Sequence, residues 1–325
     1  MRSVRFVIVV ASLAFVGCAL AQAPKSDYPN RPVRYIVPFP PGGSTDIVAR
    51  IVANGLTEEL GKSVVIDNRS GAAGTLGAEI AAHTTPDGYT LFACNIASLA
   101  VSPALYKKLG YDPAGSFAPI GLVGSNPNVL VVHPSLEVGT VAEFISYAKA
   151  RPGKLNYGSA GVGTSPQLSM EMFRMNAGLE LVHVPYKGGG PLVVAVTSNE
   201  VQAAFGTVPS WLGPGRAHKV NMLGVTSSTR SPDLPDVPTI AESGMPGFEV
   251  ISWQGLCTPA GVPEPLLARL RGALQAVLAR AETKKQLADQ GIQSKPLMGK
   301  EYAAFIRAER AKWAKLVKDV GIPPQ

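Results

Sequence analysis

The chain has 325 residues, which is too long for one compact hydrophobic core and predicts two domains. Hydrophobic residues make up 46% and charged residues 16%, a balance that is typical of a packed globular protein and excludes a disordered one. The formal net charge is +7, but the basic residues are scattered and form no basic stripe with interleaved aromatics. We therefore expect no nucleic-acid partner, and the mildly positive field favours small anionic ligands.

The N-terminus has the pattern of a secretory signal peptide. Arg2 and Arg5 precede an apolar run over residues 6–20, and Ala19-Leu20-Ala21 forms an A-x-A cleavage site. The apolar run is short for a membrane span, which needs about 20 residues. We predict that residues 1–21 are removed and that the mature chain is soluble in the periplasm.

The three cysteines leave two alternatives open. Cys18 lies in a stretch that loosely resembles a lipoprotein processing site, but Phe15 fits the start of that motif poorly, so cleavage before Gln22 is preferred. The mature chain keeps Cys94 and Cys257, which either form a disulfide or remain two buried thiols. Neither has a neighbouring His or a C-x-x-C partner, which argues against nucleophilic or metal chemistry.

The first part of the mature chain alternates short β-branched runs with helical patterns, as α/β proteins do. Apolar side chains from Ile47 to Leu60 fall on one helical face, and Gly61 is expected to end that helix. The expected elements in chain order are a strand over 33–39, the helix up to Leu60, a strand over 63–67, a helix after the turn at 68–77, and a strand over 89–93.

A second pattern of the same kind follows. Residues 117–123 and 129–133 are expected to form two strands separated by a turn at Gly124-Ser125-Asn126-Pro127. The later elements are a helix headed by Thr140, a strand over 155–159, a helix over 166–175, a strand over 180–184, a helix over 191–197, and strands over 201–205 and 220–226.

The C-terminal part returns to the first core. Residues 231–247 are rich in Pro and Gly and are typical of a connector. An expected strand over 248–256 follows, and then two helices, one beginning at Pro263 and one carrying Tyr302 to Val317. The apolar faces of these two helices must pack against a hydrophobic core, and we expect this to be the core of the first part of the mature chain.

This order of elements predicts an α/β fold with two lobes. Lobe 1 would be built from residues 22–124 and 250–325, and lobe 2 from residues 125–249. The chain then crosses between the lobes twice, which predicts a hinge and a ligand cleft between them.

The loop Pro41-Gly42-Gly43-Ser44-Thr45-Asp46 joins the first expected strand to the first expected helix. Its two glycines let backbone N–H groups approach a ligand, and the helix directs the positive end of its dipole at them. Such a loop binds an anion without a charged side chain, although Asp46 would repel a nearby carboxylate. The alternative is a tight turn in which Ser44 or Thr45 only caps the helix.

A second strand-to-helix junction supplies Ser159, Ala160, Gly161, Gly163 and Thr164 as further candidates. The Pro two residues after Thr164 fits the first helical position, and Thr164 or its neighbour fits the cap. Capping alone is again the alternative. Because the two loops belong to different lobes, we expect them to form the two sides of the cleft.

Two other loops are weaker candidates. Tyr186 could line an apolar wall, and Asn95 or Ser98 could hydrogen-bond the far end of a ligand. Lys187 fits a solvated loop charge equally well.

Enzyme motifs are missing from the sequence. Gly71-x-x-Gly74-x-x-Gly77 is not a dinucleotide fingerprint, and no G-x-S-x-G elbow is present. The four histidines lack metal-ligand spacing, so we expect neither a metal nor another cofactor. A small-acid hydrolase that uses the cleft remains the alternative to a binding protein, because a Ser/His/Asp triad is recognised by geometry rather than by spacing.

A set of motifs along the mature chain resembles the Bug family, the TctC-like extracytoplasmic receptors of tripartite tricarboxylate transporters. The motifs are Tyr28-Pro29-x-Arg31-Pro32, PFPPGGSTD (38–46), NRSGAAG (68–74), DGYTL (87–91), YGSAGVGTSPQL (157–168), VPYKGGGP (184–191), LPDVPTIAESGMPGF (234–248) and TPAGVP (258–263).

The resemblance implies the fold of a two-lobed periplasmic binding protein of the type II-like, two-crossover kind. It implies that the loops Phe39 to Asp46 and Ser159 to Thr164 hold ligand carboxylates, with Phe205 and Thr207 near the far wall of the pocket. Family ligands are di- and tricarboxylates, acidic amino acids and aromatic acids. Many relatives have an acidic residue just after Phe205, where this chain has Gly206-Thr207. Relatives also often have His-Ala-x-Asn-Pro in the region of residues 97–103, where this chain reads ASLAVSP. These differences leave the identity of the ligand open.

The leading interpretation is a monomeric binding protein that captures a small carboxylate. It would deliver the carboxylate to the membrane permease subunits of a tripartite tricarboxylate transporter, or present it to a sensor protein.

Overall fold

The computed structural model describes residues 28–320, and within this range nine strands form one sheet. Hydrogen-bonded neighbours follow the order β2-β1-β3-β9-β4-β7-β5-β6, and β8 also pairs with β4. The strands β1, β2 and β3 pair in parallel, as do β5, β6 and β7, whereas the partners of β4 and β9 are antiparallel. The strands are β1 (Val33–Val37), β2 (Val64–Asn68), β3 (Thr90–Asn95), β4 (Phe117–Val132), β5 (Asn156–Ser159), β6 (Val182–Pro185), β7 (Ala203–Thr207), β8 (Asn221–Val225) and β9 (Ile251–Pro259).

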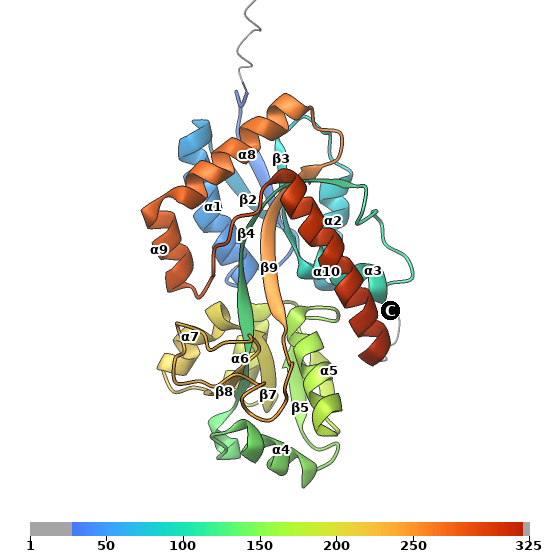
Figure 1. The fold of residues 1–325 in the computed structure, drawn as a ribbon, viewed down its shortest axis with the longest axis vertical. Coiled ribbons are helices and arrows are strands. Elements are labelled where there is room, and N and C mark those ends of the chain that lie inside the picture. The colour runs from blue at the N-terminus through green and yellow to red at the C-terminus, as the bar shows by residue number, and fades with distance from the viewer. Residues whose placement is uncertain (1–27, 321–325) are drawn as a thin grey trace, which may run out of the picture.

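Helices cover the sheet on its faces (Figure 1). They are α1 (Ser44–Leu60), α2 (Thr75–Ala82), α3 (Ser102–Leu105), α4 (Val141–Lys149), α5 (Ser165–Ala177), α6 (Gly189–Thr197), α7 (Val208–Arg216), α8 (Glu264–Ala279), α9 (Ala281–Asp289) and α10 (Gly299–Val320). Three short helical segments are η1 (Ala72–Gly74), η2 (Ala97–Val101) and η3 (Pro134–Leu136).

Local sequence explains where several helices begin and end. The helix α1 stops at Gly61, which adopts a φ of 68° that favours glycine, and this confirms the predicted stop. Thr140 and Glu143 form a capping box at the start of α4, in which each side chain accepts a hydrogen bond from the other residue's backbone N–H. Gly178 ends α5 with a φ of 63°.

Two long strands connect the two parts of the fold (Figure 1). The upper part contains β1 to β3 with α1, α2, α8 and α9, and the lower part contains β5 to β8 with α4 to α7. The strands β4 and β9 pair with each other and run from one part into the other. The predicted lobe boundary at 124/125 falls inside β4 and the one at 249/250 falls just before β9; both stay predictions.

The turn predicted from Gly124 to Pro127 is wrong, because β4 continues through these residues and all of them pair with β9. Gly124 instead allows the backbone near Gln293 to approach β4 closely. A Cβ at this position would lie 2.9 Å from the Gln293 carbonyl oxygen. The backbones of Ser125 and Gln293 exchange two hydrogen bonds of 3.0 and 2.8 Å there.

Three helices were not predicted: the short helix α3, and α7 and α9. The segment Gly213-Pro214-Gly215 is typical of a turn, yet α7 runs through it, with Pro214 inside the helix. The helix α9 follows α8 after one extended residue, Arg280. Both α8 and α9 pack against α1 in the upper part, whereas α10 packs against η2, α3 and β4.

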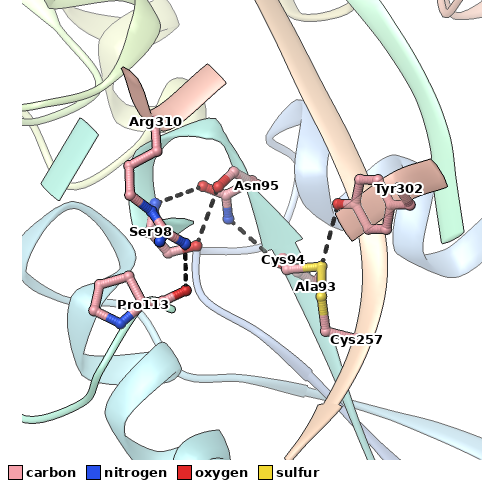
Figure 2. Close-up of a disulfide and its surroundings, with 8 residues drawn as sticks. All are labelled: Ala93, Cys94, Asn95, Ser98, Pro113, Cys257, Tyr302 and Arg310. Atoms are coloured by element: carbon pink, nitrogen blue, oxygen red, sulfur yellow. Dashed lines mark hydrogen bonds between the residues drawn. A yellow bond between two sulfur atoms is a disulfide. The ribbon is translucent and has the colours of Figure 1, made fainter. Parts of the chain in front are cut away.

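Cys94 in β3 and Cys257 in β9 form a disulfide, with their Cα atoms 5.9 Å apart (Figure 2). The structure thus selects one of the two alternatives that the sequence leaves open. The bridge joins neighbouring strands whose cysteines are 163 residues apart in sequence. The next residue, Asn95, lies opposite Gln254 of β9, so the disulfide fixes the two strands close to the site described below.

Candidate functional site

A small cavity lies between the upper and lower parts. Its free volume is about 60 Å³, which is room for roughly four to six waters and therefore for a small organic molecule. The upper part lines it with Phe39, Gly43, Ser44, Thr45, Asn95, Ile96 and Ala97, and β9 adds Ser252 nearby. The lower part lines it with Ala160, Thr164, Ser165, Pro166, Gly189, Leu192, Gly206, Thr207, Ser210 and Trp211.

Four helices direct their N-terminal ends at this cavity. The N-cap residues Gly43 of α1, Thr164 of α5 and Thr207 of α7 line it, and α6 contributes its first residue, Gly189. None of the four helices has a side-chain hydrogen bond from its N-cap residue. The first N–H groups of a helix lack partners within the helix and carry the positive end of its dipole. The cavity therefore offers N–H donors from both parts of the fold, which suits an anion.

The beginning of α1 differs in one detail from the prediction. Neither Ser44 nor Thr45 caps the helix, because the N-cap position belongs to Gly43, whose φ and ψ of −81° and 165° are extended. The Ser44 hydroxyl instead accepts a hydrogen bond of 2.6 Å from Gln254 Nε2. Ser44 and Thr45 both line the cavity, so their hydroxyls are placed to contact a ligand rather than the helix.

Asp46 does not line the cavity. Its buried carboxylate accepts hydrogen bonds from Arg50, from Asn68 Nδ2 and from the Gly42 N–H at 2.9 to 3.0 Å. Burial raises the pKa of this carboxyl, but the hydrogen bonds from Arg50, Asn68 and Gly42 outweigh burial and hold the pKa below its usual value. The Asp46 carboxylate thus holds the loop before α1 in place through these hydrogen bonds, and the Arg50 guanidinium balances its charge.

The loop Ser159 to Thr164, called the lower loop below, is stabilised by hydrogen bonds that involve its own residues. Thr164 Oγ1 donates to the Gly161 carbonyl at 2.7 Å, and the Gly163 N–H donates to Gln167 Oε1 at 2.6 Å. The Gly161 N–H donates to Ser159 Oγ at 3.2 Å. Of the predicted residues in this loop, Ala160 and Thr164 line the cavity, and Ser159, Gly161 and Gly163 do not.

His183 supports the lower loop from beneath. Its Nε2 lies 2.7 Å from Ser159 Oγ, and its ring stacks on Tyr157 with ring centroids 4.7 Å apart. Burial lowers the pKa of His183, opposed by the nearby Glu171 carboxylate and reinforced by Arg174. The neutral imidazole is therefore the form that the folded protein prefers.

The position of His183 predicts a loss of stability on mild acidification. An unfolded histidine has a pKa of about 6.5, so below that pH the unfolded chain takes up a proton that the folded protein resists, until the pH reaches the lowered folded value. The Tm should fall between pH 7.5 and pH 5.5, and His183→Gln should reduce this fall. His83→Gln, at an exposed site, serves as the control and should keep the original pH dependence. An unchanged pH dependence in His183→Gln would contradict this assignment.

The structure brings eight of the predicted site residues together at the cavity: Phe39, Gly43, Ser44, Thr45, Asn95, Ala160, Thr164 and Thr207. The other predicted residues lie outside its lining: Pro41, Gly42, Asp46, Ser98, Ser159, Gly161, Gly163, Tyr186 and Phe205. Pro41 and Gly42 lie on the exposed outer side of their loop.

Asn95 and Ser98 use their polar groups on each other (Figure 2). Asn95 Oδ1 accepts from the Ser98 N–H at 3.2 Å, Asn95 Nδ2 donates to the Ala93 carbonyl at 3.1 Å, and Ser98 Oγ donates to the Asn95 carbonyl at 3.3 Å. These hydrogen bonds fix the Asn95 side chain in the cavity wall, whereas Ser98 is buried and does not line the cavity. Arg310 of α10 fixes the following turn by donating to the carbonyls of Leu99 and Pro113.

Three other predicted residues have different surroundings. Phe205 is fully buried in the core, with its ring centroid 5.7 Å from that of Phe173. Gly161 and Tyr186 line a second cavity of about 250 Å³. Phe39 and Ala160 line both cavities, so the second one adjoins the first across these two side chains.

Thr207 was predicted from the family resemblance, but the helix α7 that follows it and the place of the α6 N-terminus at the cavity were not. A signal was present for α7, because Thr207-Val208-Pro209 repeats the order of a capping residue and an early Pro found at Thr164-Ser165-Pro166. Trp211 follows in α7 and lines the cavity with a fully buried indole. Ser252 carries no local signal, because a lone serine in a strand is common.

Charged side chains are absent from the lining of this cavity, as far as residues 28–320 are concerned. In the same range, no group of three or more His, Cys, Asp or Glu is placed to hold a metal ion. None of the described helices combines the length and apolar character that a membrane span requires.

Comparison with known proteins assigns a family. Residues 48–322 match the tripartite tricarboxylate transporter family receptor, TctC. The protein BugT of Bordetella pertussis (strain Tohama I) is 35% identical over 310 residues, which are 94% of this chain and 95% of BugT.

Solved structures agree with the sequence match. The structure of R. palustris Rpa4515 with adipate has a TM-score of 0.90 and 36% identity, and covers 92% of this chain and 100% of its own. The structure of MatC (Rpa3494) from Rhodopseudomonas palustris with bound malate has a TM-score of 0.84 and 32% identity, with 89% and 100% coverage. The predicted α/β fold of a periplasmic binding protein is thereby confirmed, and the hydrolase alternative has no support. The chain belongs to the TctC family of tripartite tricarboxylate transporter receptors and is a periplasmic solute-binding protein rather than an enzyme, as its motifs predict.

Proposed function

We propose that the protein binds a small carboxylate in the 60 Å³ cavity, with the carboxylate oxygens held by backbone N–H groups and hydroxyls at the beginnings of α1 and α5. The convergence of four helix N-termini without side-chain caps is the observation that carries this proposal. Each such N-terminus stabilises a negative charge by typically 0.3–1 kcal/mol, and up to about 2 kcal/mol where it is partly buried.

The ligands of two relatives support a carboxylate. Rpa4515 was solved with adipate and MatC with malate, and each shares about a third of its sequence with this chain. The free volume of the cavity limits the ligand to a small acid, and its apolar wall, which includes Ile96, Leu192 and Trp211, suits a short hydrocarbon chain.

We further propose that the described conformation is the closed form of a two-lobed receptor, with lobe 1 built from residues 22–124 and 250–325 and lobe 2 from 125–249. Contacts between the two parts support closure. A Cβ on Gly188 would lie 2.8 Å from Pro40 Cδ, and one on Gly163 would lie 2.9 Å from Leu105 Cδ1. Opening would bend the two crossing strands, β4 and β9.

Membership of the family supports a proposal for the partners as well. The receptor would act as a monomer that delivers the acid to the permease subunits of a tripartite tricarboxylate transporter, or presents it to a sensor protein. The predicted signal peptide over residues 1–21 and the alternative anchor at Cys18 lie outside the described residues. Export by cleavage after Ala21 remains our preferred route.

Matched acids test the proposed function. Succinate and aspartate share a carbon skeleton and differ by an ammonium group, and so do glutarate and glutamate. An ammonium group would be buried beside four positive helix ends without a carboxylate partner in the lining, so we expect the amino acids to bind on the order of 100-fold more weakly or worse. Isothermal titration of the periplasmic protein with these four compounds, malate and adipate measures the Kd values. If none of these acids binds, the proposed function is wrong; if the amino acids bind best, the charge argument is wrong.

A further inference from the structure

Gln254 lies behind the cavity wall and contacts Ser44 at the beginning of α1. Its Nε2 donates a hydrogen bond of 2.6 Å to Ser44 Oγ, although the two residues are 210 positions apart in sequence. Both side chains are buried, with 5% of Gln254 and 7% of Ser44 exposed. A hydroxyl oxygen that accepts from an amide N–H keeps its own proton for another acceptor. Because Ser44 lines the cavity, that acceptor can be a bound carboxylate.

The second polar atom of the Gln254 amide supports a functional role. Gln254 Oε1 is buried and has no hydrogen-bond partner among residues 28–320. An unsatisfied buried carbonyl destabilises the folded protein. A Met of similar length would avoid this cost and would still fill the space. The chain therefore retains a destabilising atom together with the one donor that reaches Ser44.

The backbone of Gln254 is fixed on both sides. It lies in β9 between Asn95 of β3 and Gly124 of β4. The disulfide between Cys94 and Cys257 joins the same two strands, β3 and β9. The amide of Gln254 is thus held in place by the centre of the sheet, and it can keep the Ser44 hydroxyl in one orientation.

We propose that Gln254 is a positioning residue: its N–H donor holds the Ser44 hydroxyl so that the Ser44 proton points at a carboxylate oxygen in the cavity. This inference rests on the proposed function and names a residue that acts through Ser44 without touching the ligand. Without this donor, the Ser44 hydroxyl can rotate and turn its lone pairs toward the anion.

A double-mutant cycle tests the proposal. The probes are succinate, glutarate and adipate, and the Kd values are measured by calorimetry for the unchanged protein, Gln254→Met, Ser44→Ala and the double variant. Ser44→Ala removes a hydrogen bond to a charged group and should raise the Kd roughly 10- to 150-fold. Gln254→Met should raise the Kd roughly 3- to 10-fold in the unchanged background, and by less than about twofold in the Ser44→Ala background.

Gln254→Glu provides a second readout, because it replaces the donor to Ser44 by a carboxyl group that donates only when it is protonated. At pH 7.5 the introduced carboxylate accepts the Ser44 proton and adds a negative charge, so the Kd should rise on the order of 100-fold. When this carboxyl is protonated it again donates to Ser44. Its burial raises the pKa toward the accessible range. The ratio of the variant's Kd to that of the unchanged protein, both measured at the same pH, should therefore fall as the pH is lowered to 5.

The outcomes separate the two proposals. If no probe acid binds the unchanged protein, the proposed function fails, and this inference fails with it. If the acids bind but Gln254→Met has the same effect with and without the Ser44 hydroxyl, the positioning role alone is overturned. Should Gln254→Met not fold, the Gln254→Glu series decides, because a Kd ratio that does not change with pH overturns the role as well.

Discussion

Gly43→Asp is expected to raise the Kd for succinate or adipate about a thousandfold while leaving the fold intact. Gly43 is the N-cap of α1 and lines the cavity. Its backbone is in the extended region that any residue adopts, and a Cβ there would lie 3.8 Å from the Pro40 carbonyl oxygen and 3.9 Å from the Gly189 nitrogen, which is ordinary contact. Asp is a preferred N-cap residue, so the Tm should stay the same or rise slightly.

The loss of binding has an electrostatic cause. Two like charges about 4 Å apart near a protein surface repel by about 4 kcal/mol, which corresponds to roughly a thousandfold in Kd. Gly43→Asn is the matched control, because Asn has nearly the same shape, caps a helix equally well and carries no charge. It should raise the Kd far less than Gly43→Asp does, because its amide can compete for the same N–H groups but adds no charge. Equal losses in both variants would show that space or capping of the N–H groups, and not negative charge, explains the effect, and would contradict the electrostatic argument.

Loss of the disulfide is expected to have the largest effect on stability. The bridge between Cys94 and Cys257 closes a loop with a sequence separation of 163 residues. For a loop of this length, the chain-entropy model gives about 5 kcal/mol of stabilisation. The double variant Cys94→Ala/Cys257→Ala should therefore have a Tm about 10 °C or more below that of the unchanged protein.

A reductant distinguishes the bridge from the effect of the substitutions themselves. Adding a phosphine reductant should lower the Tm of the unchanged protein toward that of the double variant, and should leave the Tm of the double variant unchanged. Calorimetry of the four samples measures both differences. A double variant whose Tm equals that of the oxidised protein would mean that the bridge contributes nothing to stability.

Much of the two site loops, Pro41 to Asp46 and Ser159 to Thr164, could be predicted from the sequence, because the signals for these loops are local. Gly42 and Gly43 precede a long amphipathic helix, and Thr164 precedes a Pro in the first helical turn. Such short patterns report the backbone directly. They correctly indicate two helix N-termini, and the structure places both at one cavity.

Long-range packing explains what the sequence does not reveal. The segment around Gly124 is typical of a turn, but it lies inside β4. A glycine is needed there because the backbone near Gln293 passes too close for a side chain. Gly213-Pro214-Gly215 is similarly typical of a turn and yet belongs to α7. Tertiary contacts override local propensity at both places.

The contact between Gln254 and Ser44 is a further example. It joins residues 210 positions apart, and nothing near Gln254 in sequence indicates a ligand site. The pairing of β9 with β3 and β4 creates it. Contacts of this kind depend on the register of distant strands, which a single sequence does not specify.

A crystal structure of the protein with succinate or adipate bound is the most direct test of the carboxylate site. We predict a carboxylate in the cavity lined by Gly43 and Thr164, with its oxygens about 2.7–3.2 Å from backbone nitrogens in the first turns of α1 and α5 and from Ser44 Oγ. An acid bound only in the second cavity beside Tyr186, or paired with a lysine or arginine at the surface, would contradict it.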